Sequence, residues 1–407
     1  MKDKFTKLGL FSLTQSFFQI GSVMMMAVTI LAGKTISENP ESASLPLSLV
    51  IFGTLIGLIP ASYMMREVGR KYGLLIGTSI GIFGIGVVSF GLYSRNFILF
   101  SVGHLFYGLH QSFLQYLRFT AMESVPHKDR ATALSWILLA GIPAAFLGPL
   151  AGLYGKDLLP NHLFLGCFLI LSISLCIQFF LIANLPQVAK TIESEMKLTH
   201  DESTSRPFSY HIRNSGLWTS VLSSGIGFGL MVMLMSAVPV AMQTHGHHMH
   251  TSTIVLQWHV LGMYIPSFFS GFLVRKLGAP KLILFGIITL FLEVIAALQG
   301  TNFLPFALAL ILLGIGWNFM YVGGTNLLVD QYHPSEKNSI QALNDTIVYL
   351  LATVSTYSSA YLESKVGWYG LNLVALPFLA IVTILVSFHI LSKHRIKPPA
   401  HVSPNLN

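Results

Sequence analysis

Four polar side chains recur along one face of an apolar stretch in the first part of the chain. Gln111, Gln115 and Arg118 follow one another at intervals of four and three residues, and His104 precedes them by two helical turns. On an α-helix this spacing places them on one face, whereas the other faces carry Leu, Phe and Val. Polar groups are costly in such a stretch unless they meet a partner or a cavity, so we expect this face to bind a solute. Arg118 suits an anionic or carbonyl group, and its alternative role is an ion pair with Glu123.

Three other apolar stretches contribute candidates for the same site. Gln15 and Gln19 lie one turn apart on one face of the first stretch, where they either line a cavity or join two helices. The indole rings of Trp258 and Trp317 are suited to stacking on a planar ligand, with packing as the alternative role. The substrate-binding candidates in these stretches are Gln15, Gln19, Trp258, His259, Trp317 and Asn318.

Two acidic residues also lie within apolar stretches. Glu293 lies in the middle of its stretch, and Asp345 follows Asn344 nearer the cytoplasmic end of another. A carboxyl group at such a depth can take up and release a proton, which is the usual basis for coupling to a proton gradient. We therefore predict both as proton-coupling residues, and a structural partner inside the protein is the alternative for Glu293.

The segment His245–His250 reads HGHHMH, a composition typical of weak metal binding. A fixed metal site needs ligands that converge on a rigid frame, and a short loop does not supply one. Cys167 and Cys176 are nine residues apart and fall on opposite faces of a helix. We predict neither a metal site, nor a disulfide, nor a cofactor.

The stretches that carry these residues are apolar runs of about twenty residues, long enough to cross a hydrocarbon core as helices. The 407-residue chain is 53% hydrophobic and only 10% charged, against roughly 25% charged residues in soluble domains. The runs are too long and too uniformly apolar for the strands of a barrel. We predict an all-α membrane protein with spans at 8–32, 45–65, 73–93, 97–120, 131–154, 162–184, 215–242, 252–274, 280–299, 303–329, 339–362 and 367–391.

One long hydrophilic segment divides these twelve transmembrane helices into two groups of six. We predict an N-terminal six-helix bundle at 1–185, a cytoplasmic linker at 186–214, a C-terminal six-helix bundle at 215–392 and a cytoplasmic tail at 393–407.

The basic residues predict the orientation of the helices in the membrane. Of the 24 Lys and Arg residues, 19 lie in the N-terminus, the linker, the tail and alternate short loops, and four lie in the remaining loops. This bias predicts a bacterial inner-membrane protein with both termini in the cytoplasm. It also explains the net charge of +8 without a nucleic-acid partner.

Two loops repeat one pattern 209 residues apart. Arg66 and Arg275 are each followed by a charged residue, and Gly69 and Gly278 stand three positions after them. Equivalent loops in two six-helix halves indicate an internal duplication. We predict that the loops that move during a conformational change contain Arg66, Glu67, Gly69, Arg70, Arg275 and Gly278.

The first of these loops, SYMMREVGRKYG, resembles the signature of the major facilitator superfamily. That signature is a small residue, Asp-Arg, one residue, and then Gly-Arg followed by Arg or Lys. Gly69-Arg70-Lys71 fits the pattern, whereas Arg66 and Glu67 present the acid in the inverted order. His104 with Gly108 and the Gly148-Pro149 element are weaker matches to the same family.

A narrower resemblance covers the second half of the chain. The stretches Gly246–Gly271 and Gly314–Asp345 are similar to a bacterial subgroup of this superfamily that includes riboflavin transporters. The resemblance implies a secondary active transporter that moves a small organic solute by alternating access. It favours proton-coupled uptake of a vitamin-like or aromatic compound.

Other functions remain as alternatives. The Gly148-Pro149 element favours efflux of a drug, a metabolite or a siderophore by antiport. A membrane enzyme or a receptor is a remote alternative, because nucleophile and phosphate-loop motifs are absent from the sequence. The expected partners are a small-molecule substrate, protons and the lipid bilayer, for a monomer that binds no nucleic acid.

Overall fold

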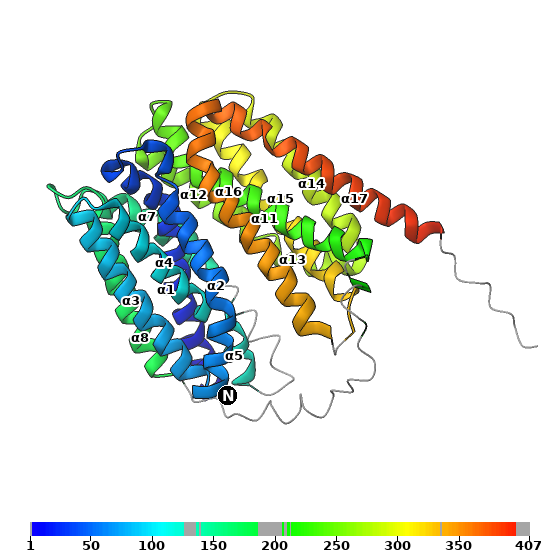
Figure 1. Cartoon of the computed structure of the whole chain (residues 1–407), viewed down its shortest axis with the longest axis horizontal. Helices are drawn as coiled ribbons and strands as arrows, with labels where there is room; N and C mark the ends of the chain where they lie inside the picture. Colours follow the sequence, from blue (N-terminus) through cyan, green and yellow to red (C-terminus); the bar gives the residue numbers. More distant parts are fainter. Residues whose placement is uncertain are drawn as a thin grey trace, which may run out of the picture.

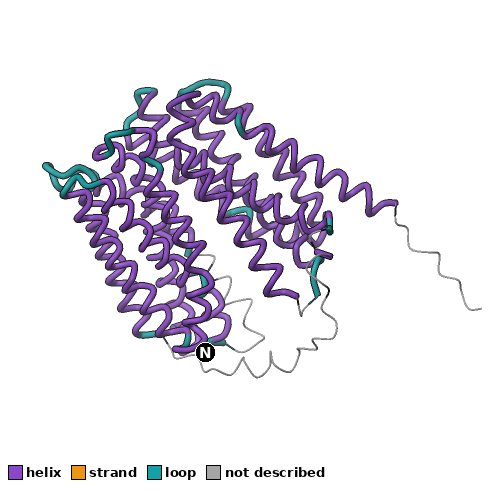
Figure 2. The backbone as a smooth tube through the Cα atoms, in the orientation of Figure 1, coloured by secondary structure: helices purple, strands orange, loops and turns teal. Residues whose placement is uncertain are grey.

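The computed structural model describes residues 2–125, 136–137, 140–185, 206, 210–211, 213–333 and 336–395. Within these residues every regular element is helical, as expected from the apolar runs (Figure 2). Each predicted span contains at least part of a described helix. Eight helices of the described part are long and apolar enough to cross a membrane as single elements.

The helices of the first half lie together in Figure 1, coloured from blue to green. They are α1 (Lys2–Ile36), the short 3-10 helix η1 (Pro40–Ser42), α2 (Leu45–Val68), α3 (Arg70–Tyr93), α4 (Phe97–Leu114), α5 (Leu117–Glu123), α7 (Gly141–Gly155) and α8 (Leu165–Ala183). The second group runs from green to red. It contains α11 (Ser215–Thr244), α12 (Met249–Tyr264), α13 (Ser267–Leu277), α14 (Ala279–Ala297), α15 (Phe303–Val329), α16 (Lys337–Leu373) and α17 (Ala375–Arg395).

Some predicted boundaries differ from the observed helices. The span 97–120 is divided into α4 and α5 by a turn at residues 115–116. The span 252–274 is divided into α12 and α13 near Pro266, which has no N–H to continue the helical ladder. The helix α16 runs past the predicted loop at residues 363–366 and bends at Gly367, whose φ of 64° breaks the helical geometry. Part of the span 131–154 and most of the linker 186–214 fall outside the described residues.

The 209-residue repeat is visible in the backbone. Gly69 joins α2 to α3 with φ 90° and ψ 158°, and Gly278 joins α13 to α14 with φ 84° and ψ 152°. Both values lie in a region that side-chain-bearing residues rarely adopt, so glycine is required at each turn. Equivalent loops of the two halves therefore make the same sharp turn between consecutive helices.

Close helix packing depends on small residues. A Cβ atom on Gly108 of α4 would overlap the backbone carbonyl of Val50 in α2, and one on Gly53 would overlap the carbonyl of Leu105. The two backbones therefore approach one another directly, as in other membrane helix pairs with small residues at the contact. This contact fixes the rotation of α4 and hence the direction of its polar face.

We name the two ends of the helices cytoplasmic and periplasmic after the predicted orientation. Between the halves, α2 packs against α16, α7 against α12, and α1 against α11. Three polar contacts join them in the described part. Ser44 donates to the carbonyl of Tyr357 at 2.6 Å, Lys365 pairs with Glu41 at 2.7 Å, and the amide of Gln257 donates to the carbonyl of Phe146 at 3.4 Å. All three lie in the periplasmic half of the helices.

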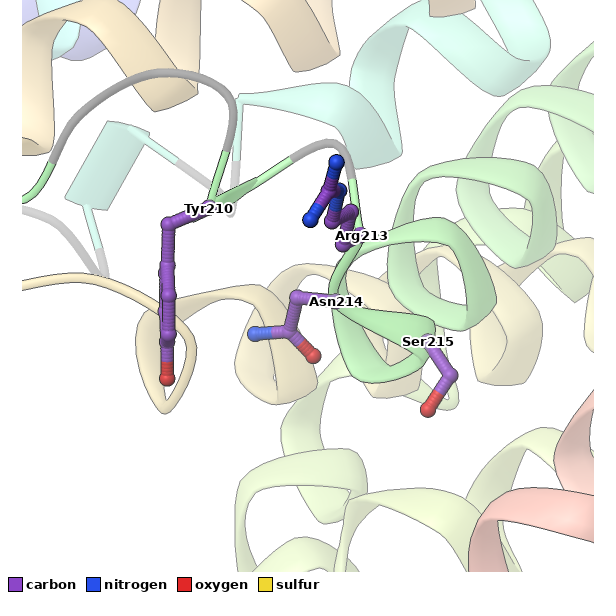
Figure 3. A pocket seen from close by; sticks show the side chains of 4 residues that line it. All are labelled: Tyr210, Arg213, Asn214 and Ser215. Carbon is purple, nitrogen blue, oxygen red and sulfur yellow. The ribbon is translucent and has the colours of Figure 1, made fainter.

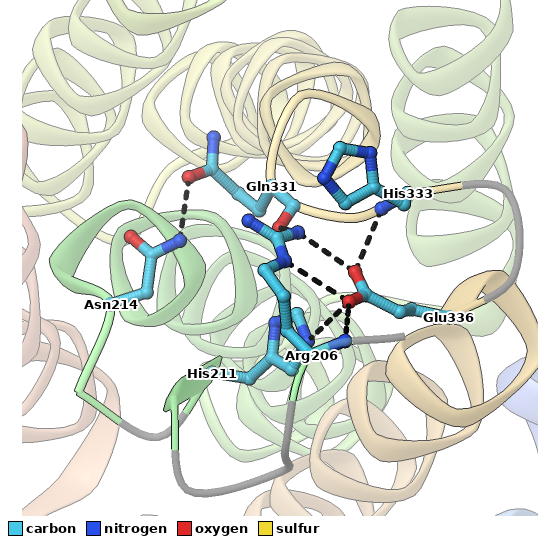
Figure 4. A network of polar contacts seen from close by, with 6 residues as sticks. All are labelled: Arg206, His211, Asn214, Gln331, His333 and Glu336. Carbon is cyan, nitrogen blue, oxygen red and sulfur yellow. Dashed lines mark hydrogen bonds and ion pairs between the residues drawn. The ribbon is translucent and has the colours of Figure 1, made fainter. Parts of the chain in front are cut away.

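A buried carboxylate ties residue 206 of the predicted linker to the start of α16 (Figure 4). Glu336 accepts hydrogen bonds from the backbone N–H of Arg206 at 2.7 Å and from its guanidinium Nε and Nη2 at 3.0 and 2.7 Å. The backbone N–H of His333 donates to the same carboxylate at 2.8 Å. The Glu336 side chain is only 3% exposed and also lies 3.4 Å from Nε2 of His211, so removing Arg206 would take the guanidinium partner from a buried carboxylate. We call this contact the Arg206–Glu336 latch.

We expect Glu336→Gln to lower the melting temperature of the purified protein by about 5 °C, because breaking a buried ion pair costs about 3 kcal/mol. Hydrogen bonds from Arg206 hold the pKa of Glu336 well below its usual range. A carboxyl group whose pKa is lowered by folding loses its stabilising effect only as the pH falls through that lowered value. The difference in melting temperature should therefore persist from about pH 8 to about pH 5.

The exposed Glu67, whose distance to Arg66 is 3.9 Å, supplies a matched control. Glu67→Gln should change the melting temperature by about 1 °C or less, because exposed ion pairs contribute little to stability. Equal shifts for Glu336→Gln and Glu67→Gln would contradict the latch.

An open pocket lies beside this network at the start of α11 (Figure 3). It has a volume of about 600 Å³ and is lined by Tyr210, Arg213, Asn214 and Ser215. Asn214 accepts a hydrogen bond from the N–H of Gly216 at 2.9 Å and donates one to Gln331 at 3.2 Å. These contacts cap α11 and fix it to the end of α15. None of the four lining residues comes from the N-terminal half, so this pocket does not lie between the halves.

Candidate substrate site

The polar face of α4 divides into a buried part and an exposed part. His104 is fully buried, and its Nδ1 and Nε2 atoms lie 2.7 Å from the carbonyl of Phe100 and 3.3 Å from the hydroxyl of Thr29. Gln111 donates to Ser22 of α1 at 3.1 Å and accepts from Thr54 of α2 at 3.4 Å. The structure thus places these two predicted binding residues in contacts that join helices of the N-terminal half.

Arg118 is the exposed end of this face. It lies in α5, and its guanidinium carbon is 4.8 Å from the centre of the Phe119 ring. Its alternative partner, Glu123, instead accepts two hydrogen bonds from Arg70, at 3.1 and 2.9 Å. The alternative of an Arg118–Glu123 ion pair is therefore wrong for this conformation, because Arg70 at the start of α3 occupies the carboxylate. The same bond joins a predicted conformational loop to α5.

The charge of Arg118 acts across the boundary between the two halves. It interacts electrostatically with Asp345 and Tyr349 of α16 and with Tyr321 of α15. Asp345 is exposed and accepts a hydrogen bond from its neighbour Asn344 at 3.1 Å. No ion pair within 4.0 Å joins Arg118 to Asp345 in the described part of the chain. The two opposite charges thus lie within electrostatic range of one another without forming an ion pair.

Four aromatic rings of α11, α15 and α16 pack together, and we name them the aromatic cluster: Phe228, Trp317, Tyr321 and Tyr349. Two of them, Tyr321 and Tyr349, are within electrostatic range of Asp345. Trp317 and Tyr321 are stacked, with centroids 5.5 Å apart and an angle of 25° between the rings. Phe228 of α11 lies 6.2 Å from both of them and 6.0 Å from Tyr349. The indole nitrogen of Trp317 is buried and has no hydrogen-bond partner among the described residues. The cluster therefore offers flat apolar faces and one unused donor.

The other predicted residues of the C-terminal half are separated by the folding of α12. Trp258 of α12 is 51% exposed, and no ring contact joins it to another described aromatic side chain. His259 is fully buried, with Nδ1 2.7 Å from the carbonyl of Leu310 in α15. Trp258 and Trp317 therefore do not form the stacking pair that a planar ligand would need.

Asn318 joins α15 to the break between α12 and α13. Its amide donates to the carbonyl of Met263 at 2.9 Å and to the hydroxyl of Ser267 at 2.6 Å. Its side-chain oxygen is buried and has no partner among the described residues. Asn318 is thus held by the protein while one acceptor stays free.

Three amides complete the candidate set in the N-terminal half. Gln15 is 9% exposed, Gln19 is half-buried on α1, and Gln115 is half-buried at the end of α4. The structure gives none of these side chains a hydrogen bond with another described residue. In the described part their amide groups are therefore not used to join helices, in contrast to that of Gln111.

The second predicted proton-coupling residue lies elsewhere. Glu293 of α14 is 1% exposed, and its Oε1 atom has no partner among the described residues. The helix α14 packs against α15, α16 and α17 of its own half. Glu293 therefore packs within its own half, away from the boundary across which Arg118 and Asp345 attract one another.

The predicted conformational loops carry exposed side chains, and the histidine segment makes hydrogen bonds to backbone carbonyls. Arg66 and Glu67 are exposed, as is Arg275 in the equivalent loop. In the histidine segment, His245 Nδ1 lies 2.8 Å from the carbonyl of Ala241, and His247 Nε2 lies 2.6 Å from that of Thr301. Among the described residues there is no group of three or more His, Cys, Asp or Glu side chains arranged to hold a metal ion.

Sequence reasoning missed three of the aromatic residues. Tyr321 follows Trp317 by four residues and Tyr349 follows Asp345 by four, so each pair shares a helical face. That spacing was a usable signal for both tyrosines. No comparable signal distinguished Phe228 from the many other phenylalanines of the chain.

Eight helices of the described part that are long enough to cross a membrane, and the same glycine turn in each half, are typical of a membrane transporter built by duplication. The sequence profile of the Major Facilitator Superfamily matches residues 10–265 and 222–405, so the chain belongs to this superfamily. It is 32% identical to the riboflavin transporter RfnT of Brucella anthropi over 87% of this chain and 88% of that protein. It is 27% identical to the uncharacterized MFS-type transporter YdeG of Bacillus subtilis over 89% of this chain and 87% of that protein.

The fold is also similar to that of a solved transporter. The crystal structure of a D-xylose-proton symporter matches with a TM-score of 0.72 at 13% identity, over 94% of this chain and 97% of that one. This match confirms the predicted fold class, and the profile match and the similarity to RfnT confirm the superfamily and a transporter rather than an enzyme.

Proposed function

We propose that the protein imports a planar aromatic solute of the riboflavin class across the bacterial inner membrane, driven by protons. The observation that carries the proposal is the position of the aromatic cluster and Asp345 opposite Arg118. Flat rings are suited to stacking on a fused aromatic ring system. Arg118 and the free amides are suited to its carbonyl and hydroxyl groups. The similarity to the riboflavin transporter RfnT supports the same class of solute.

The separation of Arg118 and Asp345 suggests how a solute and a proton share one site. The polar contacts between the halves lie in the periplasmic half, so this conformation favours access from the cytoplasm. Protonation of Asp345 would remove its attraction to Arg118 across the boundary. Solute and proton binding then bias the same rocking equilibrium of the two halves. We extend the proposal to a monomer with both termini in the cytoplasm and with the bundles and linker bounded as the sequence predicts.

Efflux by antiport is the second candidate function. Gly148 and Pro149 are buried inside α7, and a Cβ atom on Gly148 would lie 2.8 Å from Val23 of α1. This close contact at a Gly-Pro element is the observation that favours it.

Transport into liposomes tests both candidates. Purified protein is reconstituted with an inward-directed proton gradient, and the uptake of radiolabelled riboflavin is measured. We expect accumulation above the external concentration, and a protonophore should abolish it. Export of preloaded riboflavin against its gradient, with no accumulation, would favour efflux. Accumulation of a different aromatic solute without riboflavin would overturn the proposed substrate.

Removing one ring of the aromatic cluster should weaken binding more than removing an equally large ring elsewhere. We expect Trp317→Ala to raise the KM for riboflavin about tenfold, since a lost stacking contact is worth about 1.4 kcal/mol. Trp258→Ala, on the exposed face of α12, should change KM by less than about twofold. The reverse order of the two effects would contradict the site.

A further inference from the structure

A second pocket lies between the two halves at their periplasmic ends, remote in the fold from the Arg118–Asp345 site. It has a volume of about 480 Å³. The N-terminal half contributes the end of α1 and the loop between α7 and α8, and the C-terminal half contributes the end of α11 and the start of α12. The polar residues of the lining are Lys34, Thr35, Lys156, Gln243, His247, His248 and Ser252.

The lining carries positive charge without a carboxylate of its own. Lys34 is attracted by Glu363, which lies on α16 of the other half. Lys156 is the second ammonium group of the pocket, and its backbone carbonyl accepts a hydrogen bond from Phe164 at 2.9 Å. That bond holds the loop in place beneath the pocket. A concave lining with one sign of charge concentrates ions of the opposite sign.

The C-terminal half supplies hydrogen-bond donors to the same pocket. Ser252 is only 4% exposed and lines the pocket, and its hydroxyl makes no hydrogen bond with any described residue. The helix α12 begins at Met249, also in the lining. The N–H groups of Thr251 and Ser252 donate to the carbonyl of His248 at 3.0 and 3.3 Å, which leaves those of Met249 and His250 without an acceptor in the helix. His248 does not cap them with its side chain. A buried hydroxyl and the start of a helix therefore meet two ammonium groups across the boundary.

From this arrangement we propose that the periplasmic pocket binds a small anion carrying a phosphate or carboxylate group. The ammonium group of Lys156 and the hydroxyl of Ser252 contact the anion from opposite halves. The pocket exists in this form only while the periplasmic ends are together, so a bound anion stabilises this conformation relative to the outward-open one. It acts alongside the Lys365–Glu41 ion pair, which joins the same ends of the halves. External anions of this type therefore slow transport, because they hold together the periplasmic ends of the two halves, which we call the periplasmic gate.

Inorganic phosphate and citrate are the probes, compared with sodium chloride at equal ionic strength. With the purified full chain in detergent, each probe should raise the melting temperature in a saturable way. Lys156→Gln and Ser252→Ala should each weaken the apparent affinity about tenfold, and Lys156→Arg should retain it. Arg95→Gln, a change at a periplasmic cation outside the pocket, should behave like the wild type. A shift that chloride reproduces, or that all four variants retain, would overturn the proposal.

The phosphate group could belong to a free anion or to a lipid headgroup. Nanodiscs with and without phosphatidylglycerol distinguish the two sources. If the anion is free, phosphate should stabilise the protein equally in both. If it is a headgroup, phosphatidylglycerol itself should stabilise the wild type and abolish the effect of phosphate. In either case Lys156→Gln should remove the stabilisation, and its persistence in that variant would contradict the site.

A second readout reports on the gate directly. In a variant without Cys167 and Cys176, a cysteine placed at Thr35 should react more slowly with an external thiol reagent when phosphate is present. In the Lys156→Gln background, phosphate should not change the rate at which the same cysteine reacts. Protection that is unchanged by Lys156→Gln would show that the anion acts elsewhere.

Discussion

Replacing Arg118 by lysine should reduce riboflavin transport almost as strongly as replacing it by alanine, by about 100-fold in kcat/KM. A charge-assisted hydrogen bond to the solute is worth about 1.5–3 kcal/mol, and lysine lacks the planar fork that donates two parallel bonds. Arg118 is exposed at the boundary between the halves, so a lysine there should be tolerated by the fold. The measurement is initial uptake into liposomes, together with the melting temperature of each variant.

Arg213 supplies the matched control, since it is also an exposed arginine near the cytoplasmic end. Arg213→Ala should transport at close to the wild-type rate. The double variant Arg118→Gln with Asp345→Asn tests whether the two charges serve only to attract one another. If they do, the double variant should transport better than Arg118→Gln alone. Recovery in the double variant would defeat the role of Arg118 as a contact to the solute.

Replacing Asp345 by asparagine should abolish accumulation while leaving exchange of solute across the membrane. Asparagine keeps the shape and a hydrogen-bonding oxygen but cannot take up a proton, so the driving force is lost and the binding site is retained. We expect the accumulation ratio under a proton gradient to fall to about one, and exchange at equal pH to stay within about threefold of the wild type.

Glu293, the other acid within an apolar stretch, provides the comparison. Glu293→Gln should accumulate riboflavin normally, because Glu293 is buried in α14 and does not face the boundary between the halves. Loss of accumulation in Glu293→Gln with normal accumulation in Asp345→Asn would transfer the coupling role to Glu293.

Much of the fold follows from properties that the sequence carries locally. A run of apolar residues must form a helix in lipid whatever its neighbours are, since the backbone has no other source of hydrogen bonds. The glycines of the repeated loops could also be recognised, because only glycine adopts the backbone angles of Gly69 and Gly278 without strain. The helical fold class, the duplication and the superfamily were accessible for these reasons. The breaks near Gln115 and Pro266 shifted only where individual helices end.

The candidate site depends on contacts between helices that are distant in the sequence. The spacing of four polar residues predicted one common role for them. In the fold, His104 instead contacts Thr29 of α1, and Gln111 forms hydrogen bonds with Ser22 of α1 and Thr54 of α2. Arg118 does not pair with Glu123, because Arg70 at the start of α3 already donates two hydrogen bonds to that carboxylate. The electrostatic attraction between Arg118 and Asp345 likewise acts between residues of different halves of the chain.

The aromatic residues divide in the same way. Trp258 and Trp317 both lie next to polar residues inside apolar stretches of the sequence. In the fold, however, Trp258 is exposed on α12, whereas Trp317 belongs to the aromatic cluster. The rotation of each helix about its axis decides this, and close backbone contacts such as that of Gly108 with Val50 set the rotation. The sequence by itself thus determined the helices, the repeat and the class of protein. Only the tertiary structure decided which polar and aromatic side chains meet, because helix rotation and the pairing of the two halves depend on packing between distant residues.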